Sequence, residues 1–360
     1  MKEIKLLLEE IVKIKSLSGS EHRLANFIID YLKENKVNVI SQDGNVVVHL
    51  NNDSKKCLVF NAHLDTVDTG SIKLWNNDPL KLVEKDNKYY GLGVSDEKIS
   101  IAILIDLIIS LKDSKINTDL IFVFVVKEEI DGSGSESFVN YFIKNYNYDK
   151  ISCVICEPTN ASFIELGNKG NIFLEVTTKG VSNHSSKPNE ATNAVDLMFD
   201  VIKKSKDKIN TIGIKSKQLG ETTIAAPTKI NAGDSVNKIP DVCTAIFDIR
   251  TIPETHDIIM PLLNASICSN VVAVRNHAKP CRPSITAEHE HLVKLFERLG
   301  INEKRYTPGS NDACFFTNIG IPCVVFGAGS KESIHKPNEY LDIENIEKTK
   351  EVYLKLINIF

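Results

Sequence analysis

The sequence predicts an α/β protein with a doubly wound, mainly parallel sheet and an inserted ferredoxin-like α+β domain. Two near-continuous apolar runs, at 120–126 and 151–155, are typical of strands buried on both faces of a parallel sheet. Helical patterns alternate with these strands, which is the order of doubly wound folds. A length of 360 residues exceeds the size at which a single core usually stops growing, so two domains are expected.

The first part of the chain alternates helix and strand. Amphipathic spacing predicts two N-terminal helices, and short apolar stretches predict the strands. A long apolar helix is expected after Asp96, with Ser95 as its N-cap, because a serine hydroxyl can accept a hydrogen bond from the first N–H groups of a helix. The segment Gly132-Ser133-Gly134-Ser135 is expected to be a turn. The predicted elements are helices at 2–16 and 21–36, strands at 45–50 and 57–61, the helix after Asp96, and strands at 120–126 and 151–155.

The middle of the chain has a different pattern, which begins near 167–170. Its elements follow the order β-α-β-β-α-β, which is that of a self-contained ferredoxin-like unit. The predicted elements are strands at 171–178, 222–231, 243–250 and 271–274, and helices at 190–206 and 256–265. We therefore expect an inserted domain at 168–277.

The last part of the chain returns to the α/β pattern after 278. Its predicted elements are helices at 288–299 and 312–319, a strand at 322–326 and a final helix from 343. Residues 1–167 and 278–360 are therefore expected to form one domain, which the inserted domain interrupts.

Composition narrows the class of protein. The chain has 43 basic and 47 acidic residues, a net charge of −4, so neither nucleic acid nor an anionic membrane is an expected partner. No apolar stretch is long enough to span a membrane, and the N-terminus lacks the apolar core of a signal peptide. Together with eight irregularly spaced cysteines, these features predict a cytoplasmic protein without disulfides.

Side chains that can bind metals stand at or just after five apolar segments. The carboxyl ends of strands in an α/β sheet deliver such side chains to a common cleft. Two imidazoles and several carboxylates in one cleft are typical of a zinc-type hydrolase. The residues are His63, Asp96, Glu128, Glu129, Glu157 and His335.

Taken alone, some of these residues have a simpler explanation. His63 and Asp65 form a pair that chance can place on a surface, and Asp96 can be an acidic residue that complements a helix dipole. The adjacent Glu128 and Glu129 argue more strongly for function, because neighbouring carboxylates after a buried strand repel unless a cation or proton separates them. On an extended backbone they point apart, so one is expected to bind metal and the other to act as a base.

Several segments of the sequence resemble, in order, those of the M20 peptidase family of co-catalytic zinc hydrolases. The matching segments are His63-Leu64-Asp65, Gly93-Val94-Ser95-Asp96-Glu97-Lys98, Glu128-Glu129, Glu157-Pro158 and His335. Members of this family include acetylornithine deacetylase and succinyl-diaminopimelate desuccinylase. The resemblance covers nearly the whole chain, the inserted domain included.

The resemblance implies a cofactor of two divalent metal ions, with Zn²⁺ expected first and Co²⁺ or Mn²⁺ as alternatives. One metal would be held by His63, Asp96 and Glu157. The other would be held by Asp96, Glu129 and His335, so Asp96 would bridge the two. Residues 1–167 and 278–360 would then be the catalytic, metal-binding domain.

The resemblance also implies catalytic roles for three residues. Glu128 would be the general base that takes a proton from a water between the metals. Asp65 would support His63, directly or through an intervening group, because a ligating histidine usually donates its second N–H. His184, in Gly180-Val181-Ser182-Asn183-His184, would stabilise the oxyanion in the partner subunit of a homodimer formed through the inserted lid domain. A surface histidine is the simpler alternative.

Three further residues match positions that contact the substrate in the family. Asn237 and Arg250 would bind a substrate carboxylate, and Gly309 lies in a segment that resembles the loop lining the substrate site. An internal salt bridge is the alternative for Arg250, because an unpaired guanidinium on a strand among apolar residues would be unfavourable. The chain departs from the family pattern at Leu92, where arginine is usual, and at Ile99-Ser100, where glycine follows the lysine.

The expected function is that of a metal-dependent amidohydrolase of amino-acid biosynthesis. It would remove an acetyl or succinyl group from a small substrate such as N-acetylornithine, N-acetyl-lysine or N-succinyl-diaminopimelate. An M20-type dipeptidase or carboxypeptidase with the same metals is the nearest alternative. A non-catalytic protein that binds metal or a partner on this scaffold is the alternative of a different class.

Overall fold

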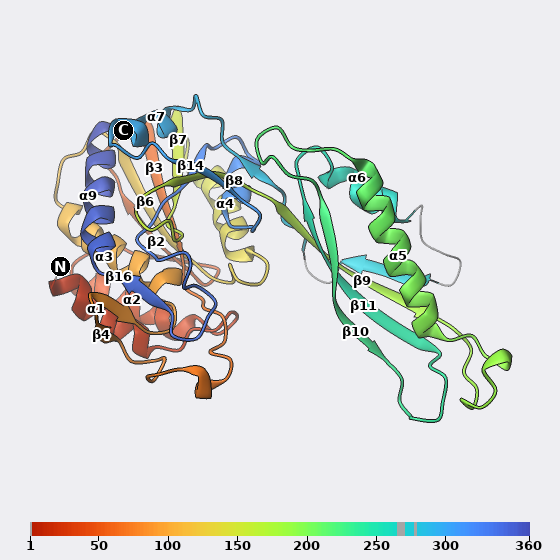
Figure 1. The fold of residues 1–360 in the computed structure, drawn as a ribbon. Helices are drawn as coiled ribbons and strands as arrows, with labels where there is room; N and C mark the ends of the chain where they lie inside the picture. The colour runs from red at the N-terminus through yellow and green to blue at the C-terminus, as the bar shows by residue number, and fades with distance from the viewer. Residues whose placement is uncertain (1, 265–270, 277–278) are drawn as a thin grey trace. The chain divides into compact units, whose positions relative to one another are not determined.

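The computed structural model describes residues 2–264, 271–276 and 279–360, which form two compact units (Figure 1). The first unit comprises Met1–Leu166, Ile285–Arg305 and Asn311–Phe360, and the second comprises Gly167–Ser284 and Tyr306–Ser310. The inserted domain expected at 168–277 falls within the second unit. Its predicted C-terminal boundary, at 277–278, lies outside the described residues.

The first unit is built on a mainly parallel sheet, which confirms the predicted doubly wound α/β class. Its central strands are β6 (Asp119–Val125), β3 (Lys56–His63), β7 (Lys150–Ile155) and β15 (Cys323–Val325), which pair side by side in parallel. The full order is β1-β2-β6-β3-β7-β15-β8-β13, and β14 pairs with β8. The outer strands are β1 (Ile40–Gln42), β2 (Asn45–Leu50), β8 (Ile164–Asn168), β13 (Ser284–Ile285) and β14 (Lys304–Thr307).

Helices cover both faces of this sheet, so the central strands are buried on both sides. On one face, Tyr353 of α9 (Glu344–Ile359) packs against Phe60 of β3, with ring centroids 5.0 Å apart. On the other face, α4 (Ser133–Asn145) and α8 (Ala313–Thr317) share an apolar cluster with alternate residues of β3, β6 and β7. Figure 1 shows α4 and α9 on opposite sides of the sheet. The remaining helices of this unit are α1 (Lys2–Lys13), α2 (His22–Glu34), α3 (Ile99–Leu111) and α7 (His291–Arg298), with a short 3-10 turn at Ile72–Leu74.

Two local predictions in this unit were wrong. Ser95 does not cap a helix, because Val94–Lys98 form a wide π-type turn in which Asp96 and Glu97 have non-helical backbone angles, and α3 begins only at Ile99. Its hydroxyl donates instead to the carbonyl of Tyr340, at 2.6 Å. The glycine-serine segment expected as a turn begins helix α4, which follows Gly132 in the left-handed conformation (φ 62°). Tertiary contacts override the local capping preference in the first case.

A small three-stranded sheet joins two distant parts of the first unit. It consists of β4 (Val83–Lys85), β5 (Lys88–Tyr90) and β16 (Tyr340–Asp342), and β16 runs antiparallel to β5 with Tyr340 opposite Tyr90. Antiparallel pairing places the residues that follow β5 beside those that precede β16. The segments 91–96 and 335–339 are therefore neighbours.

Asp119 is the first residue of β6. Its hydrogen bonds hold together the end of the sheet that lies opposite the predicted catalytic side chains. Its side chain is buried and accepts hydrogen bonds from the backbone N–H groups of Asn52 (2.8 Å) and Ser54 (3.0 Å). Tyr148 donates its hydroxyl to the same carboxylate at 2.8 Å, and His49 lies 3.1 Å away. Burial would raise the pKa of Asp119, but these hydrogen bonds outweigh it and lower that pKa.

We expect Asp119→Ala to lower the free energy of unfolding by about 2–3 kcal/mol at neutral pH, because partly buried donors lose their buried, charged acceptor. A lowered pKa in the folded state stabilises the protein above the unfolded-state pKa, and this stabilisation is lost as pH falls through the folded-state value. Between about pH 7 and pH 3, the difference between the two proteins should therefore stay constant down to about pH 5 and shrink below it. Urea unfolding of both proteins across this range measures it, and a difference independent of pH would contradict the prediction.

The second unit has the predicted ferredoxin-like order of elements. Its strands β9 (Gly170–Lys179), β10 (Ile224–Ala232), β11 (Val242–Thr251) and β12 (Val271–Asn276) form an antiparallel sheet in the order β10-β11-β9-β12. Figure 1 shows α5 (Ala194–Ile212) and α6 (His256–Asn264) along one face of this sheet. Alternate residues of β9 and β11 face these helices and form one apolar core with them.

The first helix of this unit begins later than predicted. The sequence pattern predicted a helix from 190, but Pro188–Glu190 form a 3-10 turn and α5 begins at Ala194. Asn193 caps α5 by accepting from the N–H of Val195 at 3.0 Å. The last predicted residue of the second helix, 265, lies outside the described residues.

Over the described ranges, none of the helices combines the length and the apolar character that a membrane crossing needs.

Candidate metal centre

The first group of site residues follows three adjacent parallel strands. His63 ends β3, Glu128 and Glu129 follow β6, and Glu157 follows β7. Strand β3 lies between β6 and β7. The connecting helix α3 packs beside α9 on one face of the sheet, and the connecting helix α4 lies on the other face. The carboxyl ends of strands at such a switch point form a crevice. The topology therefore brings these side chains together.

The second group comes from the segments that the small sheet places side by side. The carboxylate of Glu339 accepts hydrogen bonds from the backbone N–H groups of Gly93 (2.7 Å), Ser95 (2.8 Å) and Asp96 (3.0 Å). Gly329 is also required here, because a Cβ at that position would overlap the carbonyl of Ser95. These contacts hold the turn that carries Asp96 against the segment that carries His335.

The carboxylate of Asp96 lies between the two histidines. Its Oδ1 is 2.9 Å from Nε2 of His63, and its Oδ2 is 3.0 Å from Nε2 of His335. Each histidine has a glutamate beside it: Glu157 Oε1 is 3.6 Å from Nε2 of His63, and Glu129 Oε1 is 2.8 Å from Nε2 of His335. The five residues predicted as metal ligands are thus in one cluster, with one oxygen of Asp96 directed to each half.

Asp65 contacts His63 through its backbone carbonyl and the two glutamates through its carboxylate. Nδ1 of His63 lies 2.8 Å from the backbone carbonyl of Asp65, whereas the Asp65 carboxylate is farther, at 3.6 Å. That carboxylate accepts from the N–H groups of Glu128 and Glu129, both at 3.1 Å, and from the hydroxyl of Ser18 at 2.7 Å. The two glutamates lie in a turn beyond the end of β6, not on extended backbone as predicted.

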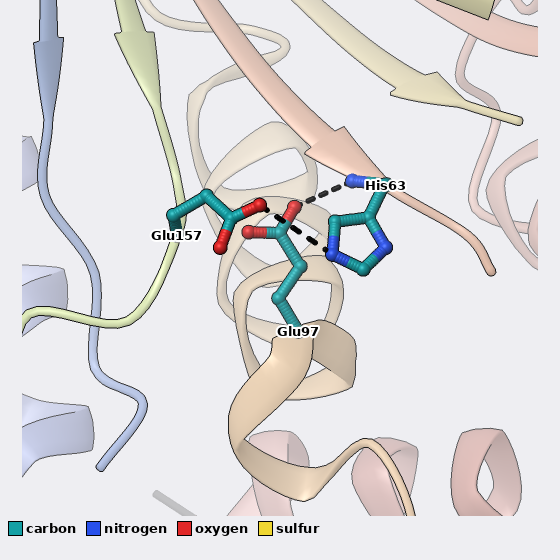
Figure 2. Close-up of side chains that lie close together, drawn as sticks. All are labelled: His63, Glu97 and Glu157. Atoms are coloured by element: carbon teal, nitrogen blue, oxygen red, sulfur yellow. Dashed lines mark hydrogen bonds and ion pairs between the residues drawn. The ribbon is translucent and has the colours of Figure 1, made fainter. Parts of the chain in front are cut away.

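Glu97 belongs to the same cluster, although it was not predicted as a site residue. Figure 2 shows its carboxylate beside Glu157 and the ring of His63. The ligand-capable atoms of these three residues lie within 4.8 Å of one another. Glu97 is 1% exposed, and its Oε1 accepts from the backbone N–H of His63 at 2.5 Å. The only signal in the sequence was its position next to Asp96.

Two more buried carboxylates adjoin the site and were also missed. Glu339 lies four residues after His335, and its role depends on the pairing of β16 with β5. Asp312 accepts a hydrogen bond from Ser135 Oγ at 2.6 Å, and Ser135 in turn accepts from Asn61 at 2.7 Å. Asp312 stands in the segment that the sequence associated with the substrate loop, which was the available signal.

The pKa values of the cluster reflect its burial and its density of carboxylates. Burial would lower the pKa of His63, but the carboxylates of Glu97, Asp96 and Glu157 outweigh it and raise that pKa well above its usual value. Burial, with the Asp96 carboxylate, raises the pKa of Glu157 to about 8. Burial would also raise the pKa of Asp96, but hydrogen bonds from His335 and His63 keep it below its usual value.

Neighbouring groups show the same excess of negative charge. Burial, followed by the carboxylates of Glu157 and Asp312, raises the pKa of Glu128 well above its usual value. Hydrogen bonds to Asp96 and Glu129 raise the pKa of the His335 imidazole to about 11. Divalent cations can balance such a buried charge. Imidazole nitrogens and carboxylate oxygens are ligands for Zn²⁺, Co²⁺ and Mn²⁺, so the donor set fits a pair of these metals.

His184 and Asn237, which were predicted as site residues, lie in the second unit and adjoin each other through the backbone. His184 is exposed, and its Nδ1 is 2.8 Å from the hydroxyl of Ser186. The segment of His184 pairs with that of Asn237, because Ser185 donates its N–H to the carbonyl of Asn237 at 2.9 Å. Asn237 is exposed and accepts from the hydroxyl of Ser235 at 2.8 Å.

Arg250 and Gly309 also lie in the second unit. Arg250, on β11, pairs with Asp248 of the same strand, with Nε 2.9 Å from Oδ1 and Nη2 3.0 Å from Oδ2. The internal salt bridge considered as the alternative for Arg250 is therefore present. Gly309 donates its N–H to the hydroxyl of Thr307 at 3.2 Å.

Comparison with known proteins gives a consistent result. The model of peptidase family M20/M25/M40 matches residues 59–359. The acetylornithine deacetylase of Buchnera aphidicola subsp. Schizaphis graminum is 29% identical, over 98% of this chain and 96% of that protein. The M20 family metallo-carboxypeptidase Sso-CP2 of Sulfolobus solfataricus has a TM-score of 0.81 with 20% identity, covering 100% of both chains. A dinuclear metal binding peptidase of the M20 family from Bacillus subtilis has a TM-score of 0.64 with 16% identity, covering 99% of this chain and 97% of that one.

Proposed function

Because this chain belongs to peptidase family M20/M25/M40 and is a hydrolase of that family, we propose that it removes an N-acyl group from a small amino-acid substrate. The acyl group would be acetyl or succinyl. The relationship to an acetylornithine deacetylase over nearly the whole chain supports this proposal. N-acetylornithine is therefore the first substrate to test, and N-acetyl-lysine and N-succinyl-diaminopimelate follow.

The proposal includes two divalent metals, with Zn²⁺ first and Co²⁺ or Mn²⁺ as alternatives. His63, Asp96 and Glu157 would hold one metal, and Asp96, Glu129 and His335 would hold the other. The observation that carries this assignment is the position of Asp96, whose two carboxylate oxygens lie 2.9 Å and 3.0 Å from the two imidazoles. A carboxylate so placed can bind one cation on each side.

When bound, the metals would supply Lewis acidity, which lowers the pKa of a water and polarises the scissile carbonyl. Glu128 would act as the general base, taking a proton from water during attack and passing it to the departing amine. The Asp65 carboxylate accepts hydrogen bonds from the backbone N–H groups of Glu128 and Glu129, and these two bonds orient the turn that carries both glutamates. Asp65 would therefore position the base, and its carbonyl would fix the orientation of the His63 ring.

The second unit would supply the remaining contacts. His184 would stabilise the oxyanion in the partner subunit of a homodimer formed through this unit. Asn237, Arg250 and the Gly309 segment would contact the substrate. Arg250 already pairs with Asp248, so a substrate carboxylate would share the guanidinium with Asp248 or displace it.

A substrate panel tests the proposed function. We expect the metal-loaded enzyme to hydrolyse at least one N-acyl amino acid with a kcat/KM at least about tenfold above that for simple dipeptides, because small pocket differences change selectivity by this order. The panel contains N-acetylornithine, N-acetyl-lysine, N-succinyl-diaminopimelate and dipeptides. The measurement is the rate of amine release, with chelator-treated enzyme and metal add-back as controls.

Any other result of the substrate panel supports one of the alternative functions. A preference for dipeptides would replace the proposal with an M20-type dipeptidase or carboxypeptidase, an alternative that the fold of the Sulfolobus carboxypeptidase supports. Metal binding without hydrolysis of any substrate in the panel would indicate a non-catalytic metal- or partner-binding protein.

A further inference from the structure

One carboxylate of the cluster has an oxygen that the local structure does not use. The side chain of Glu97 is 1% exposed, and its Oε2 has no hydrogen-bond partner among the residues that the structure describes. A buried, unpaired carboxylate oxygen is strongly unfavourable. Such an oxygen in a native site calls for a ligand.

The other oxygen of Glu97 accounts for its structural contact. Oε1 accepts from the backbone N–H of His63 at 2.5 Å, which ties the end of β3 to the turn carrying Asp96. A neutral amide oxygen could accept that N–H equally well, so this contact does not require a negative charge. The charge and the second oxygen of Glu97 therefore remain to be explained.

The surroundings of Glu97 indicate which kind of ligand would bind its charged second oxygen. Its ligand-capable oxygen lies within 4.8 Å of those of His63 and Glu157, and Figure 2 shows its carboxylate next to the Glu157 carboxylate. Two buried carboxylates at this distance repel each other unless a cation or a proton lies between them. The same two residues, His63 and Glu157, belong to one half of the proposed metal centre.

We propose that Glu97 is an additional carboxylate ligand of the metal on the His63 and Glu157 side. This inference rests on the proposed two-metal centre and adds a ligand to one half of it. The two halves of the centre would then differ: the His63 side would have the carboxylates of Asp96, Glu157 and Glu97, and the His335 side would have those of Asp96 and Glu129. The His63 side would bind its cation more tightly and with more oxygen ligands.

The added oxygen has a consequence for metal preference. Carboxylate oxygens suit Mn²⁺ better than they suit softer metals, whereas imidazole suits Zn²⁺. Glu97 should therefore raise the affinity of the His63 side for Mn²⁺ more than its affinity for Zn²⁺.

Metal binding by Glu97→Gln tests the inference, because glutamine keeps an acceptor for the His63 N–H and removes the charge. We expect the variant to bind one metal as the wild type does and the other at least about tenfold more weakly. Tenfold is about the lower end of the losses in metal affinity that follow when a residue that only hydrogen-bonds to a metal ligand is changed. Competition with a chromophoric chelator gives both dissociation constants, for Zn²⁺ and for Mn²⁺. The loss should be larger for Mn²⁺.

Thermal unfolding gives a second readout that does not depend on activity. Replacing one of the two adjacent buried carboxylates, those of Glu97 and Glu157, should relieve their repulsion and raise the melting temperature of the metal-free variant above that of metal-free wild type. The increase in melting temperature on adding Zn²⁺ should be smaller in the variant, because weaker binding stabilises the folded state less. If Glu97→Gln does not fold, Glu97→Asp replaces it in the chelator competition. Aspartate keeps the charge on a side chain one methylene shorter, and we expect the same loss of metal affinity.

Asp119→Asn is the matched control, since Asp119 is a buried carboxylate at the opposite end of the sheet strand β6. It should bind both metals as the wild type does. Equal dissociation constants for wild type and the Glu97 variant, with two metals bound in each, would overturn the role of Glu97 alone. A wild-type protein that binds no divalent metal would overturn the proposed function and this inference with it.

Discussion

Glu128→Gln is expected to reduce kcat by about 10²–10⁴-fold while leaving two metals bound, because a positioned general base contributes on that order. The side chain keeps its length and its hydrogen-bonding shape but can no longer take a proton. The backbone N–H of Glu128 still donates to Asp65, so the turn that carries it should keep its structure. Steady-state kinetics on the best substrate of the panel and metal analysis of the same preparation measure both effects.

Glu129→Gln is the matched comparison, because it makes the same chemical change on the neighbouring residue. Glu129 contacts His335, with 2.8 Å between Oε1 and Nε2, so its variant should lose affinity for the metal on that side. Restoring high metal concentration should recover part of the activity of Glu129→Gln and none of that of Glu128→Gln. A fully metallated Glu128→Gln protein with wild-type turnover would exclude Glu128 as the base.

Asp96→Asn is expected to weaken the binding of both metals by at least about 10²-fold each, which exceeds the loss expected for any ligand of one metal only. The reason is that one oxygen of Asp96 is directed to His63 and the other to His335. The backbone N–H of Asp96 still donates to Glu339, so the turn should be retained. Metal content after dialysis and chelator competition measure the loss.

Asp119→Asn again serves as control, and it should retain both metals with unchanged affinity. Binding of one metal at wild-type affinity to Asp96→Asn would contradict a shared role for Asp96. It would then assign Asp96 to one side of the centre only.

The class of fold followed from local patterns that survive in the tertiary structure. The apolar runs at 120–126 and 151–155 correspond to β6 and β7, because a strand buried on both faces has no polar side to interrupt the run. The β-α-β-β-α-β order of the second unit followed for the same reason, since each element carries its own periodicity. Turn geometry and helix starts were less predictable, as Ser95 and the helix α4 illustrate.

Most residues of the candidate site could be identified from the sequence. His63, the Glu128–Glu129 pair and Glu157 follow apolar runs, and a parallel sheet brings the ends of such runs to one edge. Their roles as ligands and base stay predictions, although the structure brings the ligand-capable atoms of His63 close to those of Glu129 and of Glu157. The roles of His184, Asn237, Arg250 and Gly309 stay predictions as well.

By itself the sequence determined which strands are buried and which charged residues end them, because burial and alternation are properties of short segments. Only the tertiary structure decided that Asp96 lies between His63 and His335, that Glu339 holds the turn of Asp96, and that Glu97 turns inward. Those contacts depend on the pairing of β16 with β5 and on a non-helical turn before α3. Contacts between segments that are far apart in the sequence produce no repeating pattern of residues along the chain. Their geometry is therefore set only when the strands of the sheets pair.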